Sequence, residues 1–252
     1  MYAVAGHWER DLSLVVTALL AASVGKHVNR PISYESFSRG HHLYHAVMVN
    51  MECGQCSPSM IHFPSLTSVH SFVDKSQPMV AITGTFFSPG SQCPVADVLV
   101  DGNLVAKGSR GTAVAVDWYG KVTIFDEPFN SNIDWGAYQF GLRGAVRVVD
   151  GGVVRPNPKA QRFHDPAIWG KASRTGLGLT ESGKLVLFAT NDKVTLSEFG
   201  KAMKSRGVRN GVSLDGGGST CFYYNGSFLI PPHRKLSNMF VVCQKATESA
   251  ID

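Results

Sequence analysis

The sequence has little charge, and what it has is not concentrated. Only 17% of its 252 residues are Asp, Glu, Lys or Arg, and no block of like charges or stripe of aromatic and basic residues is present. Proteins that bind nucleic acids usually carry such basic patches, so a nucleic-acid partner is not expected. The formal net charge of +5 still favours an anionic partner, such as a phosphate or an acidic glycan.

Long apolar runs are also missing. The run at residues 12–24 is shorter than the roughly 20 residues that cross a bilayer, so no stable membrane span is expected. The same run has the length of a signal-peptide core, and small residues near Ala21, Ala22 and Ser23 would suit cleavage. Alternatively, Asp11 would serve as the N-cap of a buried helix. Both interpretations of the N-terminus stay open.

Cysteine is scarce, with five in the chain. Cys53 and Cys56 have the spacing of a redox motif or of half a zinc site, but no second Cys or His pair follows at finger-like spacing. A local disulfide or two buried thiols is therefore favoured over a metal site, and no metal or cofactor is expected. The odd count leaves at least one cysteine unpaired within the chain.

Most of the chain reads as short strands separated by turn residues, with turn-rich sequence after residue 51. Strands are predicted at residues 44–51, 79–82, 98–100, 113–117, 122–125, 146–149, 174–179, 185–190, 211–214 and 239–243, and helices at 68–74 and 196–206. Residues 155–171 contain three prolines and are predicted to form a long irregular loop, which is often functional. The pattern predicts one α+β domain of mixed, largely antiparallel sheets with flanking helices.

A carboxylate followed by glycines and hydroxyls comes directly after the strand predicted at 211–214. Three glycines in succession cost backbone entropy, so they indicate positive φ or a ligand that touches bare backbone. The amides of Gly216, Gly217 and Gly218, with two hydroxyls beyond them, would form a nest for phosphate or another anion. A hairpin turn would need only Asp215 and Gly216, so a binding site is favoured.

Four blocks of sequence, in this order, resemble the phosphodiester glycosidase family. Ala81–Phe87 is similar to an apolar strand that ends in Asn-Gly-x-Phe-Phe, and Arg174–Gly178 resembles the family's Arg-Thr block. Leu214–Ser219 matches its Leu-Asp-Gly-Gly-Gly-Ser signature, and Arg234–Val242 is similar to its closing Arg-x-x-Ser-Asn segment. Thr83 stands where the family usually has Asn, a departure that bears on substrate choice and on activity.

The resemblance covers most of the chain and places the family's catalytic domain at residues 29–246. An N-terminal helix or signal-like segment at 1–28 would precede this domain, and a C-terminal tail at 247–252 would follow it. The resemblance also implies a secreted, periplasmic or surface-associated location. The sequence does not indicate an oligomeric state.

The implied reaction is cleavage of a sugar-1-phosphodiester, similar to an N-acetylglucosamine-1-phosphodiester, at the anomeric carbon. A phosphomonoester is a good leaving group, so fixed positive charge on the departing oxygens matters more than a general acid. Asp215 and Arg174 are the expected catalytic residues. Asp215 would act as nucleophile, as base or as stabiliser of the transition state, and Arg174 would hold phosphate oxygens. The expected substrate-binding residues are Thr83, Gly84, Thr85, Phe87, Thr175, Gly216, Gly217, Gly218, Ser219, Thr220, Arg234 and Asn238.

No second catalytic carboxylate stands out. The other acidic candidates are predicted to be structural, hairpin or surface residues: Asp97, Asp117, Asp150, Asp165 and Glu198. The alternative to an enzyme is a non-catalytic glycan or phosphoglycan binder, such as a surface or virus-particle component, that keeps the pocket. A redox protein built on Cys53 and Cys56 is a third hypothesis, which requires an accessible thiol of low pKa.

Overall fold

The computed structural model describes residues 31–88 and 90–245. The segments predicted at residues 1–28 and 247–252 lie outside the described residues. From Ile32 onward the chain forms one compact unit, and none of its described helices is long and apolar enough to cross a bilayer.

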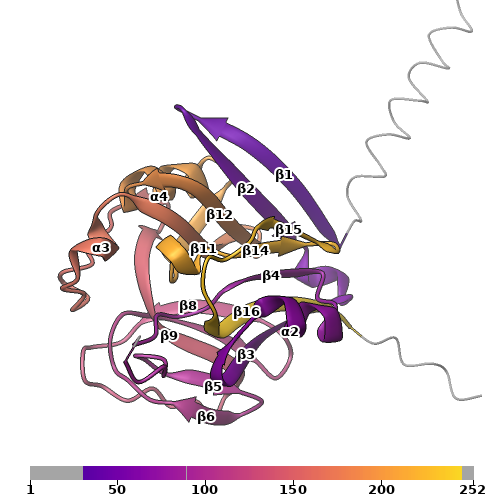
Figure 1. The fold of residues 1–252 in the computed structure, drawn as a ribbon, viewed down its shortest axis with the longest axis vertical. Helices are drawn as coiled ribbons and strands as arrows, with labels where there is room; N and C mark the ends of the chain where they lie inside the picture. The colour runs from indigo at the N-terminus through magenta and orange to yellow at the C-terminus, as the bar shows by residue number, and fades with distance from the viewer. Residues whose placement is uncertain (1–30, 89, 246–252) are drawn as a thin grey trace, which may run out of the picture. The chain divides into compact units, whose positions relative to one another are not determined.

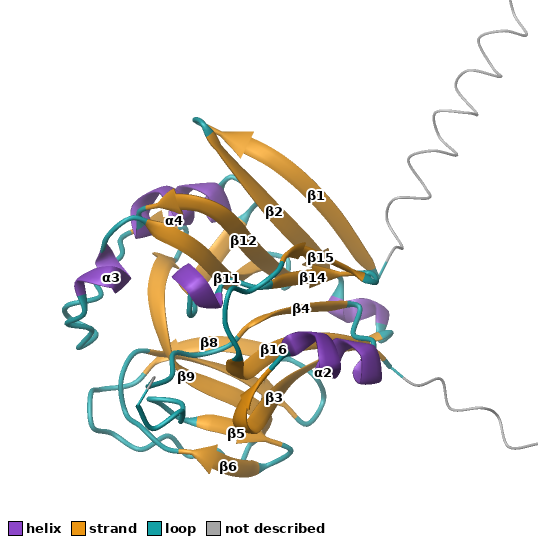
Figure 2. Ribbon diagram, viewed as in Figure 1, coloured by secondary structure: helices purple, strands orange, loops and turns teal. Residues whose placement is uncertain are grey.

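Two antiparallel sheets dominate this unit (Figures 1 and 2). Strand order along the main path of the larger, eleven-stranded sheet is β1-β2-β12-β11-β13-β9-β5-β6. Its strands are β1 (Ile32–Arg39), β2 (His42–Val49), β5 (Val98–Val100), β6 (Asn103–Ala106), β7 (Thr112–Asp117), β8 (Val122–Asp126), β9 (Tyr138–Asp150), β10 (Val153–Val154), β11 (Ala172–Thr180), β12 (Leu185–Val194) and β13 (Val208–Ser213). The smaller sheet, in the order β15-β14-β4-β16-β3, contains β3 (Cys56–Thr67), β4 (Val80–Thr83), β14 (Phe222–Tyr224), β15 (Ser227–Ile230) and β16 (Leu236–Gln244).

Helices are few and cover the outer faces of the sheets. Helix α4 (Leu196–Lys204) packs Phe199 and Met203 against the larger sheet, and a capping box between Thr195 and Glu198 begins it. Helix α2 (Val69–Ser76) packs on the smaller sheet. The short helix α3 (Pro166–Trp169) and the 3-10 turns η1 (Met51–Cys53) and η2 (Gly217–Ser219) lie in connections. The predicted α+β class therefore fits only roughly, because sheets make up most of the structure.

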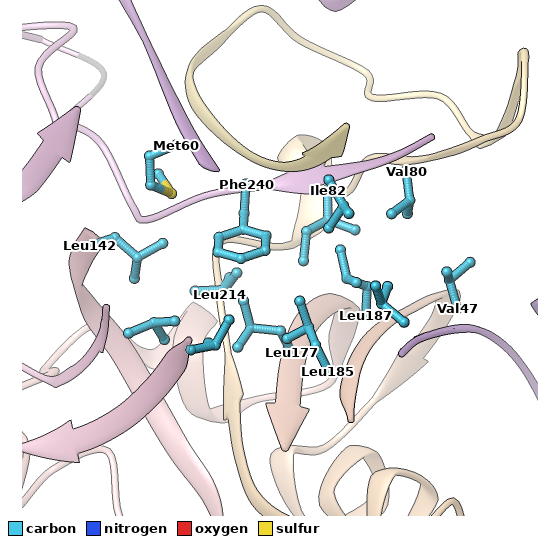
Figure 3. Packing of buried hydrophobic residues seen from close by; sticks show 14 of the residues in the cluster. Val47, Met60, Val80, Ile82, Leu142, Leu177, Leu185, Leu187, Leu214 and Phe240 are labelled. Atoms are coloured by element: carbon cyan, nitrogen blue, oxygen red, sulfur yellow. The ribbon is translucent and has the colours of Figure 1, made fainter. Parts of the chain in front are cut away.

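The main core lies between the two sheets. Figure 3 shows Ile82 and Phe240 of the smaller sheet facing Leu177 and Leu187 of the larger one. All four are at most 1% exposed. Because burying each such side chain contributes about 1.5–3 kcal/mol, this layer strongly favours one pairing of the sheets. It thereby fixes where the ends of β4, β11 and β13 meet.

Most predicted strands and both predicted helices are confirmed in type, but the structure also contains elements that were not predicted, such as β6, β14, β15 and the short α3 within the predicted irregular loop. The sequence after residue 51, predicted to be turn-rich, contains the twelve-residue strand β3. Pro58 lies within this strand and is tolerated because β3 is at the edge of its sheet, where a missing N–H removes no pairing on the open side. The strand predicted at 146–149 is only the end of β9, which starts at Tyr138.

Candidate active site

The chain brings Asp215 to a point where the two sheets meet. Leu214, just after β13, donates its amide to the Thr175 carbonyl at 2.9 Å, and the Asp215 amide donates to the Gly84 carbonyl at 3.1 Å. Thr175 belongs to the larger sheet, whereas Gly84 follows β4 of the smaller one. The Thr175 hydroxyl also donates to the Asp215 carbonyl at 2.6 Å. Both sheets therefore hold the backbone of the acid.

The positions around Asp215 require glycine for different physical reasons. A Cβ at Gly216 would lie 2.4 Å from the Ser173 carbonyl oxygen, and one at Gly84 would lie 1.9 Å from Oδ1 of Asn238. Those two glycines permit close packing. Gly217 has open space around its Cβ position but a φ of +58°, which disfavours other residues.

A layer of buried polar side chains holds the glycine segment in place. Thr83 Oγ1 donates to the Ser219 carbonyl at 2.5 Å and accepts from the Cys221 amide at 3.0 Å. Asn238 accepts from the Thr85 amide at 2.7 Å and donates to the Thr85 carbonyl at 3.1 Å. The hydrogen bonds of these side chains to the backbone hold the glycine segment and the residues after β4 in place.

A cavity of about 480 Å³ opens beside Asp215. Its size falls in the range of small-molecule sites, roughly 300–1,000 Å³. Of the residues predicted from sequence, the cavity is lined by Phe87, Arg174, Asp215, Gly216, Gly217, Gly218 and Arg234. The predicted residues that do not line it are Thr83, Gly84, Thr85, Thr175, Ser219, Thr220 and Asn238. Their predicted contact with substrate therefore stays a prediction.

Opposing effects act on the pKa of the Asp215 carboxyl group. It is 4% exposed, and this burial raises its pKa to about 6. The Ser219 hydroxyl, the Arg234 guanidinium and the Gly216 amide act in the opposite direction and lower the pKa. Oδ1 accepts from the Gly216 amide at 2.9 Å, and Oδ2 lies 3.3 Å from Nη2 of Arg234. Asp215 is thus ionised at neutral pH, yet close to the pH range of protonation.

Arg234 joins the acid to the cavity mouth. Its Nε donates to the Ser219 hydroxyl at 2.6 Å, and its guanidinium lies 4.8 Å from the centroid of the Phe87 ring. The side chain is 43% exposed, so it has N–H groups left for a ligand.

Arg174 is held differently. It is 3% exposed and donates to the carbonyls of Val194, Ile168 and Gly170, at 3.3 Å and 3.0 Å for the first two. Burial lowers the pKa of its guanidinium to about 10. No carboxylate in the described part of the chain forms an ion pair with it. A buried cation without an acidic partner, at the wall of a cavity, favours an anionic ligand.

Residues 76–243 match the sequence profile of the phosphodiester glycosidases. The chain belongs to the phosphodiester glycosidase family. The match spans all four blocks in full and two thirds of the chain, which confirms the resemblance. No curated protein matches the sequence.

Solved structures share the fold at low identity. The catalytic domain of zebrafish N-acetylglucosamine-1-phosphodiester α-N-acetylglucosaminidase, auto-inhibited by its pro-peptide, is 18% identical with a TM-score of 0.69, over 87% of this chain and 86% of that one. A Synechocystis protein is 15% identical with a TM-score of 0.71, over 85% of this chain and 62% of that one. A Burkholderia pseudomallei protein, described by its name as exported, is 12% identical with a TM-score of 0.57, over 95% and 82%. At these identities the likeness establishes the fold alone.

Further residues that were not predicted line the cavity of this family member, among them Arg110, Phe163 and Asp165. Asp165, predicted to be structural, does cap α3 by accepting from the Ala167 amide at 2.9 Å, but it is also a second carboxylate at the cavity. Phe163 and Asp165 belong to the proline-containing loop that the sequence marked as often functional. Arg110 had no signal, because one arginine in a turn region resembles any surface residue.

The cysteines form no part of this site. None of Cys53, Cys56, Cys93, Cys221 and Cys243 is in a disulfide; Cys56 is a buried thiol and Cys53 a half-buried one. Burial raises the pKa of the Cys56 thiol to about 11, the reverse of what a redox-active thiol requires. Among residues 31–88 and 90–245, no cluster of three or more His, Cys, Asp or Glu side chains is arranged to hold a metal ion.

Proposed function

We propose that the chain is a glycoside hydrolase that cleaves a sugar-1-phosphodiester, similar to an N-acetylglucosamine-1-phosphodiester, at the anomeric carbon. The observation that carries the proposal is the buried Asp215 beside Arg234 at the mouth of a glycine-floored cavity. Family membership supports the general chemistry. The name of the zebrafish neighbour supports the sugar.

In this mechanism, two arginines hold the departing phosphate. Arg234 binds it at the mouth and Arg174 from the wall, while the Gly216–Gly218 backbone gives close access. The bond between the anomeric carbon and the phosphate oxygen breaks, and its electron pair leaves with the phosphate. Asp215 acts on the anomeric carbon, either directly or by deprotonating the attacking water. Water supplies the new hydroxyl, so the products are a free sugar and a phosphomonoester.

Thr83 stands where the family usually has Asn, and in this proposal that difference changes how the glycine segment is held in place. Its hydroxyl ties the Ser219 carbonyl and the Cys221 amide, so the glycine segment stays anchored to β4. We therefore assign Thr83 to holding the loop, which leaves the binding of sugar and phosphate to groups that line the cavity.

Hydrolysis in heavy-oxygen water tests the proposal. We expect a panel of sugar-1-phosphodiesters to yield reducing sugar that carries the label, with turnover lost in Asp215→Asn. Asp150→Asn is the matched control, since Asp150 pairs with Arg155 away from the cavity and its loss should leave turnover unchanged. Label on the phosphate would instead identify a phosphodiesterase. Binding by wild type and by Asp215→Asn, without any turnover, would favour the non-catalytic glycan binder.

We also propose that the protein is secreted, periplasmic or surface-associated. The name of the Burkholderia pseudomallei neighbour supports an exported location. Detection of the full chain in the exported fraction of expressing cells would agree with this proposal, and strict retention in the cytoplasm would contradict it.

A further inference from the structure

The β1–β2 hairpin and helix α4 (Figure 1), together with β10, line a groove on the larger sheet. It has two compartments, of about 400 Å³ and 510 Å³, and Arg39 and Lys201 line both of them. This hairpin groove shares no lining residue with the cavity that contains Asp215. We propose that it binds an acidic glycan, a saccharide chain that carries carboxylates or sulfates, through Arg39, Lys201 and the hydroxyl of Tyr44.

Three exposed cations converge on the hairpin groove. Lys201 and Lys204 are three positions apart in α4, so their side chains leave the same side of the helix, and Arg39 joins them from the end of β1. Within residues 31–88 and 90–245, none of these three forms an ion pair. Their N–H groups therefore remain for the oxygens of an anionic ligand.

The acids near the groove are bound to the protein itself. Glu198 is the acid in the lining, and its Oε2 accepts from both the amide and the hydroxyl of Thr195, each at 2.8 Å. Asp192 accepts from the Leu43 amide at 2.7 Å and lies 3.7 Å from Nδ1 of His42. These contacts stabilise the two carboxylates, so they compete only weakly with a ligand for the three cations.

A buried hydroxyl supplies the groove with a specific donor. Tyr44 is 1% exposed and lines the smaller compartment. Buried tyrosine hydroxyls usually have a hydrogen-bond partner, but this one has none among the residues that the structure describes. Burial, with Glu198 and Asp192 nearby, raises the pKa of Tyr44 to about 12, so the hydroxyl stays protonated. It can therefore donate to an oxygen that enters the compartment.

The shape of the groove favours a saccharide chain over a bilayer or a nucleic acid. Both compartments fall in the size range of small-molecule sites, so successive pyranoses can occupy them. A flat lipid surface does not reach a hydroxyl that is buried at the wall of a cavity. The ring of Tyr44 is stacked on Phe37, with 5.5 Å between centroids, so it is not available to stack on a nucleic-acid base.

Calorimetric titration with acidic hexasaccharides tests the hairpin groove. We expect wild type to bind hexagalacturonate or a heparin hexasaccharide, and not the neutral maltohexaose. Arg39→Gln and Lys201→Gln should each weaken the affinity about fivefold or more, because each loses a charge-assisted hydrogen bond. Lys75→Gln is the matched control: Lys75 is an exposed lysine in the last turn of α2, as Lys201 is in α4, and it does not line the groove. Its affinity should equal that of wild type.

Two further variants separate this site from general charge attraction and from the Asp215 cavity. Tyr44→Phe removes the hydroxyl and keeps the ring that packs on Phe37, so we expect it to stay folded and to bind about threefold more weakly. Arg234→Met removes a cation from the Asp215 cavity and should bind the glycan as wild type does. Turnover is not measured in these titrations, so their result is independent of the proposed function.

Several outcomes would overturn the inference. Wild type might fail to bind either acidic hexasaccharide, or Lys75→Gln could lose as much affinity as Lys201→Gln. Unchanged affinity in Tyr44→Phe would show that the hydroxyl does not contact the ligand. Loss of binding in Arg234→Met, with Lys201→Gln unaffected, would place the glycan in the Asp215 cavity. Binding to vesicles of phosphatidylglycerol, lost in Lys201→Gln and without any glycan binding, would identify a membrane surface as the partner.

Discussion

Asp215 needs its negative charge to attack the anomeric carbon or to deprotonate water, and its pKa of about 6 sets the pH at which that charge appears. We expect log kcat/KM to fall as pH drops below about 6, because protonation removes the reactive form. Arg234 lowers this pKa, so Arg234→Met should move the acid limb to higher pH, in addition to reducing the rate. A pH profile of both enzymes, with Arg155→Met as control, measures the shift. An acid limb that stayed in place would show that Arg234 does not interact with the titrating group.

Asp215 should also cost the protein stability at neutral pH. Its folded pKa of about 6 lies above the ordinary 3.8, so between these values the folded state binds more protons than the unfolded state, and stability falls as pH rises. Asp215→Asn should therefore increase the free energy of unfolding at pH 7.5 by up to about 3 kcal/mol, and much less at pH 4. Denaturant titrations at both pH values measure this. A variant less stable than wild type at pH 7.5 would mean that the bonds from Gly216 and Arg234 to the carboxylate outweigh its burial.

Among the structural elements, the glycine segment offers a paired comparison. A methyl group at Gly216 would meet the Ser173 carbonyl of β11, whereas one at Gly217 would meet open space and only the strain of positive φ. We expect Gly217→Ala to lose about 1–2 kcal/mol of stability and to keep measurable turnover. Gly216→Ala should lose more of both, because the segment must move away from β11 and carries Asp215 with it. Unfolding curves and kcat for the two variants decide this, and equal losses would contradict the packing argument.

Arg174 ties α3 to the sheet, and this role can be separated from its charge. Its Nη1 and Nη2 donate to the carbonyls of Ile168 and Gly170 while Nε donates to that of Val194, three bonds in a fixed plane that lysine cannot reproduce. We expect Arg174→Lys to speed amide hydrogen exchange in residues 166–170. Arg143→Lys is the control: Arg143 donates to carbonyls of Glu127, Pro128 and Ser131, so its replacement should loosen that loop and not α3. Unchanged exchange in α3 would show that the helix does not depend on Arg174.

At the scale of the whole molecule, the sequence predicted the strands better than their arrangement. Period-two patterns and turn residues mark a strand locally, but β16 pairs with both β3 and β4, which lie far from it in the sequence. The same limit applies to the site. Asp215 and Arg234 follow from motifs, whereas Asp165 reaches the cavity only through the path of a loop. No pattern could show that the Thr83 hydroxyl faces the glycine segment rather than the cavity.

The net charge of +5, with three arginines at the Asp215 cavity, should speed the capture of an anionic substrate. We expect kcat/KM for a sugar-1-phosphodiester to fall as salt is raised, with kcat nearly constant, because salt screens exposed charges beyond roughly 8 Å at physiological ionic strength. Arg234 is the arginine of this group placed at the mouth, so Arg234→Met should flatten the salt dependence as well as lower the value. A neutral aryl glycoside of the same sugar is the control, and its turnover should not respond to salt in this way. If both substrates responded alike, salt would be acting on the fold and not on the encounter with phosphate.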